Sequence, residues 1–170
     1  MLRVYVSNVV PGFLQTEEYA TALLTAITDF QGTPNDVAEA VRSRRKRDQA
    51  LREGDHRFVV LLEESVLRYR IGGREVMRGQ LAYLLEVIGL PSVALGVIPF
   101  TADRMRMWPL EALYMFDDER VVVETLAAEI NVTVPSEIQL YQRAFLAQNR
   151  MAVYGPAARE LIEAAITALG

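Results

Sequence analysis

The spacing of apolar residues along the chain predicts helices at both of its ends. The first predicted helix follows Thr16, a residue type that caps helices, and ends at Gly32. Four apolar residues recur along it at helical spacing: Tyr19, Leu23, Ala26 and Phe30. A second helix is predicted over residues 34–54 and a third over residues 77–88. Two more begin near Pro135 and Gly155 and complete the chain.

Between these helices, four segments have the pattern of strands. Residues 56–63 and 92–100 are mostly apolar, which is typical of buried strands. Residues 110–116 and 121–134 also predict strands, and the polar residues 117–120 between them predict the turn of a hairpin. We therefore predict one α+β domain over residues 1–170. Its sheet is expected to be small and at least partly antiparallel, with about four strands and with helices at both ends of the chain.

Composition excludes several classes of chemistry. The chain has no cysteine, which excludes disulfides, thiolate zinc sites, iron–sulfur clusters and cysteine catalysis. His56 is the single histidine, so this chain cannot build a multi-histidine metal site alone. No glycine-rich phosphate-binding loop is present either. We therefore expect no cofactor and no bound metal.

The charge pattern also restricts the partners. The net charge of -4 does not favour nucleic acid, although residues 42–47 hold five of the eighteen basic residues. That basic run lies on the second predicted helix, where a solvated helix face and a contact with phosphate or an acidic partner are both open interpretations. No segment has 18 consecutive apolar residues, and the N-terminus lacks the pattern of a signal peptide. We expect a cytoplasmic protein that does not bind membranes.

Three ionisable side chains are candidates for acid–base chemistry. His56 stands between charged neighbours at a predicted loop–strand boundary, where a surface role competes with a catalytic one. Glu64 belongs to a Glu-Glu pair that follows a predicted strand. Glu124 lies within an apolar strand pattern, so partial burial would require a partner such as Arg68 or Arg120. A structural ion pair is the alternative to a catalytic acid there.

A second group of candidates is apolar and lies in or beside the predicted loop 101–109. Methionine and aromatic side chains suit adaptable binding surfaces, although they also pack beneath loops. The members of this group are Met105, Met107, Trp108 and Tyr114.

Several short motifs, in order along nearly the whole chain, carry a family resemblance. They include residues 10–20 (VPGFLQTEEYA), 58–68 (FVVLLEESVLR), 107–111 (MWPLE) and 152–155 (AVYG). The series resembles a domain that is common in actinobacteria, follows an Xre-type helix-turn-helix and is catalogued as a domain of unknown function. The resemblance implies a regulatory domain of a transcription factor. Because the sequence begins within the domain itself, DNA contact is expected only through an N-terminal domain absent from this chain.

We therefore predict a non-enzymatic effector and dimerisation domain, a homodimer that binds an unknown small molecule or small protein. Its predicted ligand-binding residues are Glu64, Arg68, Met105, Met107, Trp108, Tyr114 and Glu124. One alternative is a cofactor-independent cyclase, isomerase or hydrolase that uses Glu64, Glu124 or His56 as acid or base. The other is a protein-interaction module for a small partner protein.

Overall fold

The computed structural model of the protein describes residues 1–34 and 36–170, with the backbone alone for residues 45–50. The strands are β1 (Leu2–Val6), β2 (Phe58–Glu63), β3 (Val93–Ile98), β4 (Leu113–Phe116), β5 (Arg120–Glu124) and β6 (Glu129–Val132). The helices are the short 3-10 helix η1 (Gly12–Leu14), α1 (Glu17–Gln31), α2 (Val37–Arg52), α3 (Glu64–Arg68), α4 (Arg74–Val87), α5 (Pro135–Asn149) and α6 (Gly155–Thr167).

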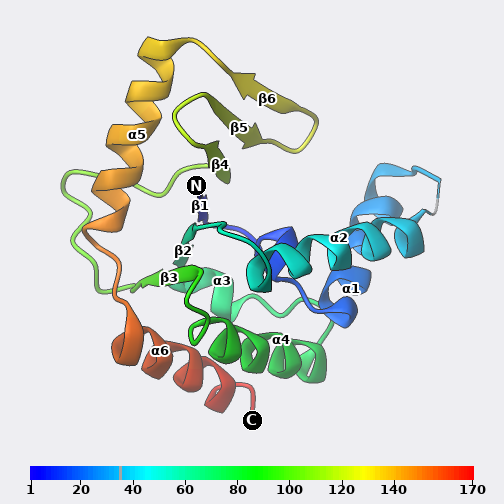
Figure 1. Ribbon diagram of the computed structural model, residues 1–170. Helices are drawn as coiled ribbons and strands as arrows, with labels where there is room; N and C mark the ends of the chain where they lie inside the picture. The colour runs from blue at the N-terminus through cyan, green and yellow to red at the C-terminus, as the bar shows by residue number, and fades with distance from the viewer. Residues whose placement is uncertain (35) are drawn as a thin grey trace.

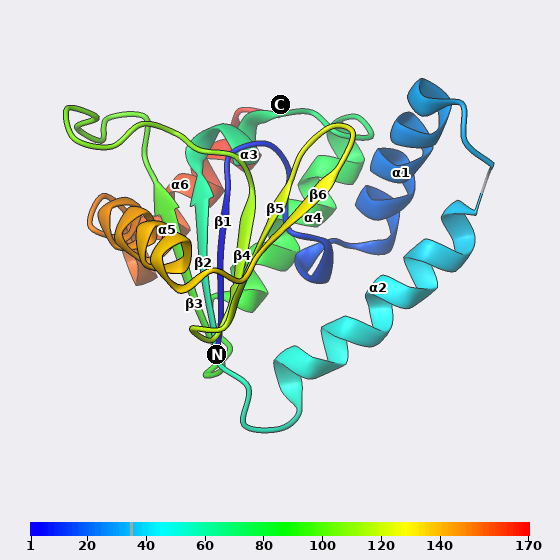
Figure 2. The same cartoon turned by 90° about the horizontal axis from the view of Figure 1, so that it is seen from above.

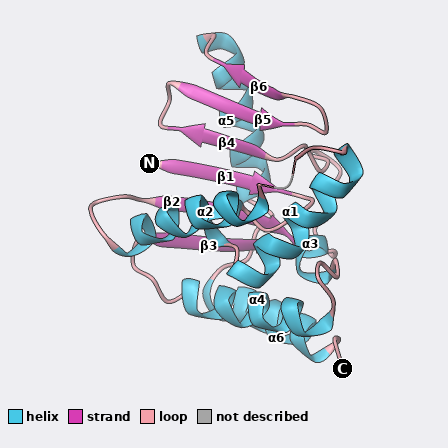
Figure 3. Ribbon diagram, turned by 90° about the vertical axis from the view of Figure 1, so that its right-hand side faces the viewer, coloured by secondary structure: helices cyan, strands magenta, loops and turns pink. Residues whose placement is uncertain are grey.

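The strands of the described chain form one six-stranded sheet with the order β3-β2-β1-β4-β5-β6. Strands β1, β2 and β3 are parallel, whereas β4, β5 and β6 continue the sheet in antiparallel pairs. Figure 3 shows this order from β6 at one edge to β3 at the other. Strand β1 therefore lies where the parallel half meets the antiparallel half.

The α+β class fits the structure, but the prediction of about four strands is wrong, because the sheet has six. The first additional strand is β1, which begins at Leu2 and has no preceding turn to mark it in the sequence. The second arises because the segment predicted as one strand, residues 121–134, divides into β5 and β6. The predicted hairpin between β4 and β5 is confirmed.

Helices cover both faces of the sheet, and alternation along the strands separates two cores. Val4 and Val6 of β1 belong to the larger core, which includes residues from α1, α4 and α6. Tyr5 points the other way, into a smaller core that includes Ile138 and Phe145 of α5. Figure 3 shows α5 behind the sheet, and Figures 1 and 3 show α4 and α6 beneath its parallel half.

Helices α1 and α2 form an arm on one side of the sheet (Figure 2), and Figure 3 shows them in front of β1 and β2. The predicted cap of α1 is present, since the Thr16 hydroxyl accepts a hydrogen bond from the Tyr19 amide at 3.3 Å. At the other end of α1, Gly32 adopts the left-handed conformation that ends the helix. Tyr19, the first residue of the predicted apolar series, is buried. Phe30 is 76% exposed, because the far end of α1 extends past the core.

A buried glutamine fixes the base of this arm. Gln80 of α4 accepts a hydrogen bond from the Thr16 amide and donates one to the Leu14 carbonyl, both at 2.8 Å. Its side chain is fully buried, so it satisfies two backbone groups that would otherwise lack partners in the core. The start of α1 is thereby anchored to the domain.

Within the described residues, every helix is too short or too polar to cross a membrane.

Candidate ligand-binding groove

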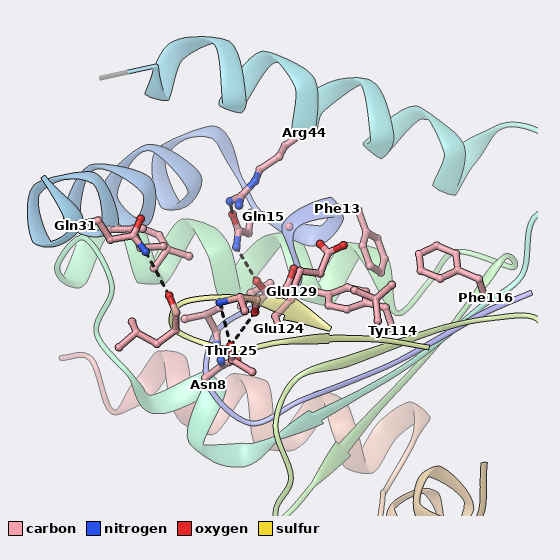
Figure 4. A pocket seen from close by; sticks show the side chains of 18 of the residues that line it. Asn8, Phe13, Gln15, Gln31, Arg44, Tyr114, Phe116, Glu124, Thr125 and Glu129 are labelled. Carbon is pink, nitrogen blue, oxygen red and sulfur yellow. Dashed lines mark hydrogen bonds between the residues drawn. The ribbon is translucent and has the colours of Figure 1, made fainter. Parts of the chain in front are cut away.

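A groove of 740 Å³ lies between the antiparallel half of the sheet and the arm formed by α1 and α2 (Figure 4). Tyr114, Val122 and Glu124 of the sheet contribute to one side. Ile27 of α1 and Arg44 of α2 contribute to the other. A volume of this size accommodates a drug-sized molecule, and the lining combines apolar and charged side chains.

The strand register explains which side chains line the sheet side. Tyr114 lies opposite Val122, and Glu124 lies opposite Glu129 on the neighbouring strand. Because Tyr114 lies opposite Val4 of β1, these residues share the face that carries the larger core. The carboxylates of Glu124 and Glu129 are therefore cross-strand neighbours.

The turn between β5 and β6 holds these two carboxylates in place. The Thr125 amide donates to the Ala128 carbonyl at 2.9 Å, and the Thr125 hydroxyl bonds to both the carbonyl and the amide of Ala128. Leu126, at the tip of this turn, lines the groove and is 76% exposed. Its carbonyl accepts a hydrogen bond from Gln31 of α1, at 3.4 Å, which links the turn to the arm.

Arg44 brings a positive charge to the groove from α2. Its guanidinium donates a hydrogen bond to Gln15, whose own amide nitrogen donates to the Val10 carbonyl at 2.7 Å. Gly12 is close by, since a Cβ added there would lie 3.4 Å from the Arg44 Nε atom. This chain of contacts joins α2 to the loop that follows β1.

The groove perturbs the acidity of Glu124. Burial raises the pKa of its carboxyl group, the neighbouring Glu129 carboxylate raises it further, and the Arg44 guanidinium partly opposes the rise. The sequence predicted Arg68 or Arg120 as the partner of Glu124. Instead the Arg120 guanidinium lies 4.5 Å from the centre of the Phe116 ring, and Arg68 pairs with Glu64.

A family model described as a domain of unknown function (DUF5753) matches residues 1–164. The chain belongs to the DUF5753 family. Searches of curated proteins and of solved structures give no match. The chemistry of this DUF5753 domain is therefore inferred from its own side chains.

Of the seven predicted site residues of the DUF5753 domain, Tyr114 and Glu124 line the groove. The remaining five lie elsewhere: Glu64, Arg68, Met105, Met107 and Trp108. The structure thus brings two of the seven together in this groove.

Glu64 and Arg68 are joined to each other within α3. The Arg68 guanidinium contacts one Glu64 carboxylate oxygen at 3.0 Å, and the Phe100 amide donates to the other at 2.9 Å. The Glu64 side chain is buried, so these bonds satisfy a carboxylate that is removed from water. This arrangement ties α3 to the end of β3.

A separate polar network on the α5 face holds the loop that carries the predicted methionine and tryptophan residues. The Tyr5 hydroxyl donates to Glu63 at 2.7 Å, and Glu63 also pairs with Arg104. Burial, followed by the bond to Glu63, raises the pKa of Tyr5. Gln148 of α5 accepts from Arg104 at 3.0 Å and donates to the Trp108 carbonyl at 2.7 Å. The network fixes the loop and leaves the Trp108 side chain 66% exposed.

His56 does not line the groove, whereas one described residue of the basic run does. His56 is exposed and contacts Phe58, with ring centres 6.4 Å apart. Within the basic run, Arg42 is exposed and Arg44 lines the groove, whereas the side chains of residues 45–47 lie outside the described part. Among the described residues, no group of three or more histidine, aspartate or glutamate side chains is placed to hold a metal ion.

Sequence reasoning missed most of the groove. Phe13, Gln15, Arg44 and Glu129 were not predicted as site residues, although each lines it. The spacing of Glu124 and Glu129 would have paired them if residues 125–128 had been recognised as a turn. That segment, Thr-Leu-Ala-Ala, contains none of the glycine, proline, asparagine or aspartate residues that mark turns.

Proposed function

We propose that this chain is the effector domain of an actinobacterial Xre-type transcriptional regulator, and that it binds a small molecule in the groove between α2 and the sheet. The domain is non-enzymatic and cytoplasmic, forms a homodimer, and reaches DNA only through a separate N-terminal domain. The observation that carries the proposal is the groove of 740 Å³, which combines apolar walls with a few charged side chains. The ordered family motifs support the regulatory context.

The position of the groove suggests how binding would be transmitted. Arg44 belongs to α2, whereas Tyr114 and Glu124 belong to the sheet. A ligand that contacts both sides would favour the arrangement in which α2 docks on the domain. The ligand stabilises the docked arrangement of α2 only to the extent that it binds this arrangement more tightly than any other. Such a bias on α2 is the signal that an attached DNA-binding domain would receive.

Native mass spectrometry tests this proposal directly. The protein is purified gently from its source organism, and its intact mass is compared with that of two variants. Val122→Trp fills the groove, whereas Trp108→Ala alters an exposed side chain outside it. We expect a reproducible adduct in the unmodified protein and in Trp108→Ala, and its loss in Val122→Trp. No adduct in any sample, or an adduct lost only in Trp108→Ala, would refute the proposal.

One observation favours an enzyme as the second candidate. Glu124, with a raised pKa, and its neighbour Glu129 form a carboxyl pair of the kind that performs acid–base chemistry. Glu64 and His56 do not line this groove, so the pair would have to act without them. If fresh protein converts the isolated adduct into a product, and the Glu124→Gln variant does not, catalysis is favoured over sensing.

A further inference from the structure

We propose that β6 is the dimerisation edge of this domain, where it pairs antiparallel with β6 of a second copy and joins the two sheets into one. The inference rests on the proposed function, because it names the surface that forms the homodimer. Three observations carry it: outward backbone groups of β6 that lack partners, an exposed apolar residue beside them, and a register in which the strand complements itself.

The two edges of the sheet differ in how they are covered. At the β3 edge, Val97 exchanges two backbone hydrogen bonds with Val153, at 2.8 and 2.9 Å, and the Tyr154 ring lies against Gly96. At the other edge, β6 pairs with β5 alone, and no further segment of the described chain adds a strand to it. Figure 3 shows β6 as the last strand of the sheet, with α5 behind it. An open edge of this kind is a template for another strand.

The strand register identifies the backbone groups that lack partners. The Glu124 amide donates to the Ala112 carbonyl at 3.2 Å, so the backbone groups of Glu124 point toward β4. Because this direction alternates along a strand, those of Val123 point toward β6, where Ile130 lies opposite. The amides and carbonyls of the next residues, Glu129 and Asn131, therefore point away from β5. Among the described residues, nothing hydrogen-bonds to these outward groups.

The side chains of β6 do not protect this edge. Ile130 is 49% exposed, although its neighbour on the same face, Val132, belongs to the smaller core. Proteins commonly block an open edge with lysine, proline or a bulge. Strand β6 has neither a lysine nor a proline, and its register with β5 is continuous, without a bulge. The edge is therefore free to accept a strand.

A second copy fits this edge because β6 complements itself under two-fold symmetry. When Asn131 lies opposite Asn131 of the second copy, Ile130 lies opposite Val132 in both halves of the contact. The α5 side of the joined strands then matches apolar with apolar, which covers the exposed part of Ile130. Such a contact uses the same surface on both chains, as the interfaces of two-fold homodimers do.

The other side of the joined strands keeps like charges apart. In the same register, Glu129 lies opposite Thr133 of the second copy, so the two Glu129 carboxylates do not face each other. The two Asn131 side chains meet at the symmetry axis, where each amide offers both donors and an acceptor. Glu129 also lines the groove, so the dimer interface and the candidate ligand site share one strand.

Sedimentation equilibrium of the full chain tests the inference with two substitutions that block the edge. Ile130→Lys places a charge in the apolar row, and Asn131→Pro removes an amide that points away from β5. Leu146→Lys is the matched control, since Leu146 is an apolar residue of α5 that is 55% exposed and lies outside β6. We expect the unmodified protein and Leu146→Lys to dimerise equally, and each edge variant to weaken the dimer about 100-fold or more.

Circular dichroism verifies the fold of each variant at a protein concentration at which the unmodified protein is monomeric. An unmodified chain that stays monomeric over the whole concentration range would overturn the inference. A dimer that survives both edge substitutions would also overturn it.

A cysteine at the symmetry axis tests the register. Because the chain has no cysteine of its own, Asn131→Cys introduces a single thiol. Paired Cα atoms at such a position lie about 5.5 Å apart, within the roughly 4.4–6.8 Å that a disulfide spans. We expect mild oxidation to give a covalent dimer of this variant and none of Glu160→Cys, on the exposed side of α6. A dimer in solution that does not crosslink at residue 131 would contradict the proposed pairing.

The outcomes separate the interface from the proposed function. If the dimer survives both edge substitutions, the inference fails and the proposed homodimer uses another surface. If the unmodified chain is monomeric but native mass spectrometry shows the groove adduct, the inference fails and the ligand-binding role stands. A monomeric chain without an adduct would refute both.

Discussion

Substitution of Gly96 by alanine should destabilise the protein, because the Tyr154 ring lies directly on this position of β3. A Cβ added to Gly96 would lie 2.7 Å from the Tyr154 Cζ atom, 2.8 Å from Cε1 and 3.1 Å from the hydroxyl oxygen. Favourable contacts between carbon atoms lie at about 3.5–4.0 Å. The ring must therefore move, or the strand must shift.

The ring is restrained on both sides. The Tyr154 hydroxyl donates a hydrogen bond to Asn149, and the preceding residue, Val153, exchanges two backbone bonds with Val97 at 2.8 and 2.9 Å. Overpacking of this kind costs about 1–3 kcal/mol. Replacement of glycine in an element interior normally gains only about 0.5–1 kcal/mol, so the clash decides the sign. In a domain of this size, the melting temperature should fall by about 2–10 °C.

The assay is a double-mutant cycle followed by urea unfolding. Gly96→Ala is compared in the unmodified protein and in Tyr154→Ala, where the clash is absent. We expect a coupling energy of about 1 kcal/mol or more. Gly79→Ala is the control, since nothing lies within 4 Å of its added Cβ in α4, and this change should stabilise by about 0.5–1 kcal/mol. A Gly96→Ala variant that is equally destabilised in both backgrounds would refute the reasoning.

Three further predictions concern the buried polar groups and the groove. Gln80→Leu removes both hydrogen bonds to the backbone that precedes α1 and should cost about 2–4 kcal/mol in urea unfolding; a loss below 1 kcal/mol would contradict its anchoring role. Arg104→Met leaves the Glu63 carboxylate without its cation and should cost roughly 2–4 kcal/mol, part of which Glu63→Gln should restore in the same background. Because the folded-state pKa of Glu124 is raised, its contribution to stability is lost as pH rises through that pKa. Glu124→Gln should therefore become more stable relative to the unmodified protein as pH rises, in parallel unfolding series; a difference independent of pH would contradict this.

Helices were predicted well because their signals are long and local. Thr16 and Gly32 delimit α1 in the sequence, and the structure places a cap and a left-handed residue at these positions. The strands were harder to predict. Strand β6 has only four residues, and β1 is defined as a strand by its pairing with distant segments. Local patterns contain no record of such pairing.

The candidate site was predicted only in part for a related reason. Glu124 was recognised because an acidic residue interrupts an apolar strand, which is a local anomaly. Arg44 was hidden among five basic residues, and only the packing of α2 shows that it turns toward the sheet. Trp108 was predicted as a site residue because its loop is rich in methionine and aromatic residues. This loop lies on the α5 side of the sheet, and the sheet separates it from the groove.

The central place of β1 has a consequence for the way the protein is made. This strand leaves the ribosome before either of its neighbours, which begin at Phe58 and Leu113. At about 5–20 residues per second, β1 waits roughly 3–11 s for its parallel partner and roughly 6–22 s for its antiparallel one. During synthesis both edges of an apolar strand therefore remain open. Translation speed and chaperone supply should therefore influence the soluble yield of this domain.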